Sequence, residues 1–141
     1  MPPSEEVLAA IERYQPGDDH WSDLDDLLNR LWEAGPPEGA MVAETLLRVF
    51  ERFPEDDGNG VFWSILHGLE SLPEYEPALV ASVRRQPVEF TVLMVNRILN
   101  VGQVRIGEVD GRALLAEVLV HRLTPAQTRQ AAQDYLRRHQ P

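Results

Sequence analysis

The chain has 141 residues, of which 43% are hydrophobic and 26% are charged. This size and composition are typical of one globular domain and exclude a disordered or collagen-like chain. Cysteine is absent, which excludes a disulfide scaffold, thiol catalysis and cysteine-ligated zinc or iron–sulfur sites. The net charge of −10 disfavours nucleic acid and anionic membranes as partners and favours basic proteins.

The negative charge is concentrated in the first half of the chain. Residues 1–60 carry 15 acidic side chains and four arginines, whereas residues 61–141 carry eight acidic side chains and nine arginines. Acidic residues interrupt the first thirty positions, and no apolar run approaches the roughly 18 residues of a membrane span. We therefore expect neither a signal peptide nor a membrane span, and we expect a cytoplasmic protein.

Apolar residues recur at helical spacing, and proline, glycine and capping residues divide the chain into about eight segments. We expect Ser4 and Ser22 to be the N-caps of the first two segments. An i,i+4 pair of Glu44 and Arg48 is expected on the outer face of the third. In chain order, these three segments run from Ser4 to the Pro16-Gly17 break, from Ser22 to Gly35, and from Glu38 to Phe53.

The second half of the chain predicts five further helices. The sixth segment is apolar on almost every side, so we expect it to lie at the centre of the domain. Residues 102–111 are expected to form a long loop, because a single extended stretch there has no partner strand. Three of these predicted helices run from Phe62 to Leu72, from Glu76 to Arg85 and from Val88 to Val101. The last two are expected to have Asp110 and Thr124 as their N-caps.

These segments predict an all-α fold with about eight helices in antiparallel pairs, forming a single helical domain over residues 1–141. Helical pairs recur at about residues 38–72, 76–101 and 109–138. This arrangement is typical of an irregular HEAT-like α-solenoid, and a helical bundle is the alternative.

The sequence contains no recognisable catalytic arrangement. Its four histidines have neither a His partner at i+4 nor a Ser or Cys nucleophile in a recognisable turn. His67 and Glu70 have the spacing of a carboxylate metal site, but the second such pair is missing. The segment from Asp56 to Gly60 does not fit a calcium loop in any frame and predicts a turn. We therefore expect no enzyme, no metal and no cofactor.

Trp63, His67 and Glu70 form a stripe beside the main apolar face of the fourth segment, and Tyr75 follows it. In one interpretation Trp63 is a core residue, and His67 and Glu70 satisfy each other or a loop. In the other, these residues form a partner-binding ridge, because Trp and Tyr are enriched among binding hot spots. A third face of small residues would let another helix pack closely; its members are Ser64, Gly68 and Ser71.

Two further groups of polar residues have alternative interpretations. Polar side chains interrupt the sixth segment at Asn96, Arg97 and Asn100, and we expect them to bond to a loop. An acidic set surrounds Trp21 and is either solvated surface or a patch that meets a basic protein. Its members are Asp18, Asp19, Asp23, Asp25, Asp26, Glu55, Asp56 and Asp57, with Trp21 among the partner-binding candidates.

The run from Phe62 to Leu72, followed by Tyr75 and then by residues 96–100, resembles the small helical immunity proteins of bacterial polymorphic and contact-dependent toxin systems. The resemblance covers about forty residues in the middle of the chain. It implies a cytoplasmic protein that occludes one cognate toxin domain without catalysis. An acidic inhibitor of a basic toxin would gain fast, steered association. The alternative is a helical-repeat scaffold or adaptor that binds another basic protein. The positions that the resemblance implies are Trp63, His67, Glu70, Asn96 and Asn100.

Overall fold

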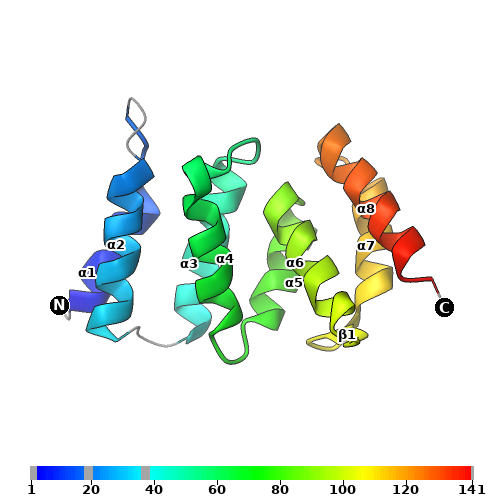
Figure 1. Cartoon of the computed structure of the whole chain (residues 1–141), viewed down its shortest axis with the longest axis horizontal. Coiled ribbons are helices and arrows are strands. Elements are labelled where there is room, and N and C mark those ends of the chain that lie inside the picture. Colours follow the sequence, from blue (N-terminus) through cyan, green and yellow to red (C-terminus); the bar gives the residue numbers. More distant parts are fainter. Residues whose placement is uncertain (1–2, 18–20, 36–38, 141) are drawn as a thin grey trace. The chain divides into compact units, whose positions relative to one another are not determined.

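The computed structural model describes residues 3–17, 21–35 and 39–140, and over these residues the predicted all-α class is confirmed. The described parts contain eight α-helices, one 3-10 turn and one hairpin of two very short strands (Figure 1). The chain divides into two compact units, which we call unit 1 (Met1–Tyr75) and unit 2 (Glu76–Pro141). The single domain and the choice between a solenoid and a bundle stay predictions.

Unit 1 is built from four helices whose apolar stripes face one another. Helix α1 packs against α2 and α3, and α4 packs against α2 and α3. In α2, Leu24, Leu28 and Leu31 are buried, which is the i, i+4, i+7 stripe of an amphipathic helix. The elements are α1 (Pro3–Arg13), α2 (Trp21–Ala34), α3 (Gly39–Arg52), η1 (Gly58–Gly60) and α4 (Val61–Glu70).

An aromatic cluster closes one end of the unit 1 core. The Trp21 ring meets the rings of Phe53 and Phe62 edge-on, with centroids 5.2 and 5.3 Å away, and the tilted Tyr14 ring is 5.9 Å away. Phe53 and Phe62 stand on either side of the loop between α3 and α4. The cluster therefore fixes this loop against the first residue of α2.

Gly58 lets the loop between α3 and α4 pass close to the aromatic cluster. Its φ of +61° lies in the left-handed region, and a Cβ atom there would be 2.7 Å from Cδ1 of Phe62 and 3.5 Å from Cδ2 of Trp21. Both the backbone conformation and the available space therefore require glycine at this position.

A close contact between α2 and α4 confirms part of the predicted small-residue face. A Cβ atom on Gly68 would lie 2.4 Å from Cζ2 of Trp32, so the indole of α2 occupies the space that a larger side chain would need. Ser64 and Ser71 are exposed, and the Ser71 hydroxyl donates to the Gly68 carbonyl at 2.6 Å. The small face thus serves packing at Gly68 alone among its three members.

Arg52 links the end of α3 to the end of α1. Its two Nη atoms donate to the carbonyls of Ile11 and Tyr14, each at 2.8 Å. These carbonyls lie at the negative end of α1, where a cation is favourable. Burial lowers the pKa of this guanidinium from its ordinary value.

Unit 2 surrounds a largely buried helix, as the sequence predicts. Helix α6 has eight buried residues among its twelve, a larger share than any other described helix. Leu93, however, is only half-buried. Helix α6 packs against α5, α7 and α8, and α7 packs against α5 and α8. The elements are α5 (Glu76–Arg85), α6 (Glu89–Asn100), β1 (Arg105–Ile106), β2 (Val109–Asp110), α7 (Gly111–Val120) and α8 (Ala126–Arg138).

The prediction of a long loop over residues 102–111 is wrong, because the extended stretch finds a partner within the same segment. Arg105 pairs with Asp110 and Ile106 with Val109 in an antiparallel hairpin (Figure 1). Gly107 takes a φ of +59° at the turn, and its N–H donates to the Glu76 carboxylate at 2.9 Å. Ile106 is fully buried, so the hairpin contributes a core residue to unit 2.

Helix starts differ from the predicted caps at three of four positions. Asp110 is the N-cap of α7, and its carboxylate accepts from the Ala113 N–H at 2.9 Å, as predicted. Ser4 and Ser22 lie inside α1 and α2, because each helix begins one residue earlier. Thr124 does not cap α8, because its hydroxyl donates to the Val118 carbonyl at 2.7 Å instead.

Asn96 is buried in α6 and has a polar partner, although the partner is the end of a helix and not a loop. Its Oδ1 accepts a hydrogen bond from Nε2 of His139, at the C-cap of α8, over 2.8 Å. Burial, followed by the charges of Arg138 and Arg112, lowers the pKa of His139. Asn96 therefore joins α6 to α8, whereas Asn100 is exposed.

Candidate protein-binding surface

The three residues of the predicted ridge lie on α4, and the structure places Trp63 on the surface. We call Trp63, His67 and Glu70 the α4 ridge. Trp63 is 42% exposed and His67 is also exposed, whereas Glu70 is half-buried. The interpretation of Trp63 as a core residue is therefore wrong. The predicted contact between the other two exists, with Nδ1 of His67 3.9 Å from Oε1 of Glu70, an ion pair only when the imidazole is protonated.

The aromatic part of the α4 ridge is continuous, but Tyr75 is not part of the helix. The rings of Trp63 and His67 are tilted by 36° with centroids 6.2 Å apart. Helix α4 ends at Glu70, and Tyr75 lies half-buried beyond Glu74, which has a φ of +59°. Tyr75 therefore follows α4 in the chain without belonging to the helix.

The described acidic residues come from two segments that meet at one end of unit 1. Asp23 and Asp26 are exposed and Asp25 is half-buried at the start of α2, while Asp18 and Asp19 lie outside the described residues. The contacts of Trp21 with Phe53 and Phe62 bring the loop between α3 and α4 to the same end. We call this group the acidic end; its members are Asp23, Asp25, Asp26, Glu55, Asp56 and Asp57.

Trp21 is a core residue and offers a partner little surface. Its side chain is 5% exposed, because three aromatic rings and the Gly58 backbone enclose it. Its expected role as a binding residue is therefore corrected to a structural one. Trp21 helps to position the acidic end but does not form part of the surface of that group.

Two carboxylates of the loop between α3 and α4, those of Asp56 and Asp57, stabilise the loop conformation in addition to carrying negative charge. Oδ1 of Asp56 accepts from the Gly58 N–H, and Oδ1 of Asp57 accepts from the Asn59 N–H, each at 2.9 Å. Such bonds are typical of turns, which confirms the predicted turn. Both side chains remain exposed, as does Glu55.

Among the residues that the structure describes, no three His, Cys, Asp or Glu side chains are grouped so that they could hold a metal ion.

The electrostatic environment of unit 1 is strongly negative. Its sequence carries 17 acidic side chains and four arginines, and two of these arginines are engaged locally. Arg48 pairs with Glu44 at 3.0 Å, as predicted, and Arg52 binds backbone carbonyls. Burial, and then the charge of Asp23, raise the pKa of Tyr14 beside the acidic end. Such a field attracts cations and basic proteins.

The α4 ridge begins next to the acidic end. Trp63 is in the first turn of α4, directly after the loop that carries Glu55, Asp56 and Asp57. Phe62, its neighbour in sequence, packs on Trp21 beneath that loop. An exposed indole therefore follows a group of exposed carboxylates closely in the chain. An apolar anchor with a charged surround is a combination that protein partners use.

Sequence reasoning did not single out Met41, which is a further exposed apolar side chain of unit 1. It lies on α3 and is 52% exposed. The sequence contained a signal for this exposure, because Met41 precedes Val42 and so lies off the apolar stripe that Val42 forms with Leu46 and Val49.

No helix within the described ranges has an apolar stretch long enough to cross a membrane.

Comparisons with known proteins identify no relative: no family model, no curated protein and no solved structure matches this chain.

Proposed function

We propose that this chain is an immunity protein, which binds a cognate bacterial toxin domain through unit 1 and occludes it stoichiometrically. The observation that carries the proposal is the exposed Trp63 beside the exposed carboxylates of the acidic end. The resemblance of residues 62–72 and 96–100 to immunity proteins of polymorphic and contact-dependent toxin systems supports it. The protein acts in the cytoplasm, its partner is a basic domain, and no catalysis is involved.

The two parts of this surface have different roles in binding. Exposed carboxylates act at long range and raise the rate of encounter with a basic partner. An exposed indole acts only in contact, where its burial slows dissociation. Kinetic measurements on single variants therefore separate the acidic end from the α4 ridge.

We expect neutralisation of the acidic end to slow association. The variant Asp23→Asn, Asp26→Asn, Glu55→Gln removes three exposed charges, and its association rate with the basic domain should fall roughly tenfold at low salt. The rate should also depend less on ionic strength. Stopped-flow association at two salt concentrations measures both effects.

The matched control removes three exposed acidic charges away from that end: Glu5→Gln, Glu6→Gln, Glu33→Gln. Circular dichroism verifies that both triple variants are folded. Equal slowing by the two variants would show that net charge acts without any defined patch, and the assignment of the acidic end would then be rejected.

We expect Trp63→Ala to speed dissociation. Loss of a hot-spot indole costs about 2 kcal/mol or more in binding, which corresponds to a dissociation rate roughly thirty times higher. Its association rate should change little, because the substitution leaves the charge unchanged. Surface plasmon resonance gives both rates, with Ser64→Ala, the exposed neighbour on α4, as the control. An unchanged dissociation rate places the interface elsewhere.

The function itself is tested by co-expression with the C-terminal domain encoded by the adjacent gene. A growth-inhibitory domain that this chain neutralises through a stable complex supports the proposal. Protection without a complex, or a neighbouring product that is not toxic, refutes it. A stable complex with a basic protein that is not toxic would instead support the helical-repeat scaffold.

A further inference from the structure

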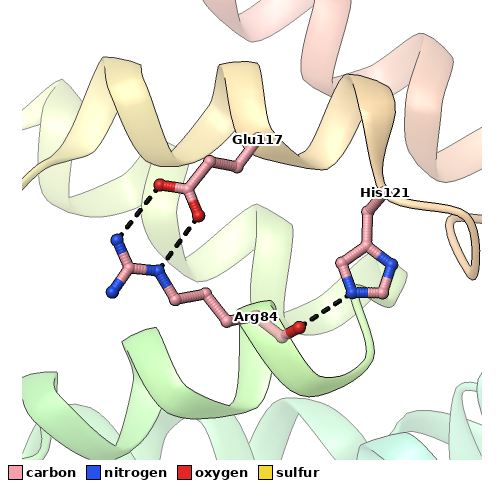
Figure 2. A network of polar contacts seen from close by, with 3 residues as sticks. All are labelled: Arg84, Glu117 and His121. Carbon is pink, nitrogen blue, oxygen red and sulfur yellow. Dashed lines mark hydrogen bonds and ion pairs between the residues drawn. The ribbon is translucent and has the colours of Figure 1, made fainter.

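His121 lies where three segments of unit 2 meet and bonds to two of them through its ring. It is the C-cap residue of α7 and precedes the turn to α8. Its Nε2 is 2.8 Å from the carbonyl oxygen of Arg84, at the end of α5 (Figure 2). Its Nδ1 is 3.1 Å from the backbone nitrogen of Leu123, in the turn. The imidazole therefore connects the turn to α5.

Both partners are backbone groups, so they determine the tautomer of the ring. A carbonyl oxygen can only accept a hydrogen bond, and a backbone N–H can only donate one. Nε2 therefore carries the proton that is donated to Arg84, and Nδ1 presents the lone pair that accepts from Leu123. This arrangement requires a neutral imidazole.

Protonation would break one of these bonds and keep the other. A proton on Nδ1 would point at the N–H of Leu123, and two donors cannot bond to each other. The bond from Nε2 to the Arg84 carbonyl would remain, because a charged donor at the negative end of α5 is favourable. We propose that His121 is a pH-sensitive latch, which holds the α7–α8 turn to α5 when neutral and releases Leu123 when protonated.

Three of the charged groups around His121 have partners of their own: Glu117, Arg84 and Arg129. Glu117, one turn earlier in α7, holds the Arg84 guanidinium through two hydrogen bonds of 3.0 and 3.1 Å (Figure 2). From α8, Arg129 donates to the carbonyls of Leu119 and Thr124 at 3.1 and 3.2 Å. Arg85 of α5 and Arg122 of the turn are exposed.

The release would be confined to the tip of the turn. Thr124 holds the following residues independently, since its N–H donates to the His121 carbonyl at 3.2 Å and its hydroxyl donates to Val118. Leu123 is 51% exposed, so its release uncovers little apolar surface. The ends of α7 and α8 therefore stay packed while the backbone of Leu123 becomes free.

Nuclear magnetic resonance on the full ¹⁵N-labelled chain tests the latch. Long-range ¹H–¹⁵N correlations at pH 7.5 report the tautomer of His121, and we expect the proton on Nε2. Hydrogen exchange of the Leu123 amide is then compared at pH 7.5 and pH 5, after correction for its intrinsic pH dependence. We expect protection to fall roughly fivefold to tenfold at pH 5, the effect of losing one hydrogen bond.

The variant His121→Gln should abolish the loss of Leu123 protection between pH 7.5 and pH 5. The variant His67→Gln, which alters an exposed histidine of unit 1, should preserve that loss. A proton on Nδ1 at pH 7.5, equal protection at both pH values, or a step that persists in His121→Gln would each overturn the proposal. If His121→Gln does not fold, the tautomer and the exchange of the wild-type chain still decide the question.

Discussion

Replacement of Trp21 by alanine should lower the free energy of unfolding of unit 1 by about 3 to 5 kcal/mol, the usual range for removing a large aromatic side chain from a core. The ring is in contact with three other aromatic rings, those of Tyr14 after α1, Phe53 after α3 and Phe62 in α4. Such pairs contribute beyond the area that they bury. Its loss would leave a cavity between the start of α2 and the loop between α3 and α4.

Urea unfolding followed by circular dichroism measures the effect of Trp21→Ala, and Trp63→Ala is the matched control. The same substitution at the exposed Trp63 should cost less than about 1 kcal/mol, because that indole is not enclosed. The two tryptophans should therefore have opposite phenotypes, one in stability and the other in binding. Equal costs in stability would contradict the assignment of Trp21 to the core and Trp63 to the surface.

In unit 2, Ile98→Ala should lower the free energy of unfolding by about 2 to 5 kcal/mol. Ile98 is 6% exposed on α6, the helix that packs against α5, α7 and α8. Removal of its three outer carbons loses both transfer free energy and contacts that the neighbouring helices cannot fully restore.

Leu93→Ala on the same helix is the comparison variant. Because Leu93 is half-buried, it has less apolar surface to return to water, and we expect a cost of about 1 to 2 kcal/mol. Thermal and urea unfolding of both variants give the difference. A larger cost at Leu93 than at Ile98 would show that α6 turns a different face to the core.

The helices of this chain could be predicted because their signal is local. Leu24, Leu28 and Leu31 repeat at helical spacing within one segment, and the helix that they predict needs no distant information. The hairpin of residues 105–110 could not be predicted this way, since two strands of two residues are too short for any periodicity. Its formation depends on the burial of Ile106 and on the bond from Gly107 to Glu76, which lies far away in the sequence.

The two tryptophans show where sequence reasoning about the surface fails. Trp21 stands among aspartates and was expected at the surface, but Phe53 and Phe62 from distant segments cover it. Trp63 stands among apolar residues, yet it lies beside the stripe formed by Phe62, Leu66 and Leu69 and remains exposed. Position relative to the helical stripe was the better guide for Trp63, whereas the burial of Trp21 depends on tertiary contacts.

The fixed geometry at Gly58 limits how the proposed binding surface could be redesigned. Residues 55–57 and 59 are exposed, but Asp56 and Asp57 also accept hydrogen bonds from the backbone of Gly58 and Asn59, so exchanging these two side chains would alter the loop. Gly58 cannot be replaced, because any side chain at this position would collide with the Phe62 ring and the backbone φ of +61° is unfavourable for other residues. A combinatorial library that tests the proposed surface should therefore randomise position 55, restrict positions 56 and 57 to side chains that accept the same hydrogen bonds, and keep Gly58 unchanged.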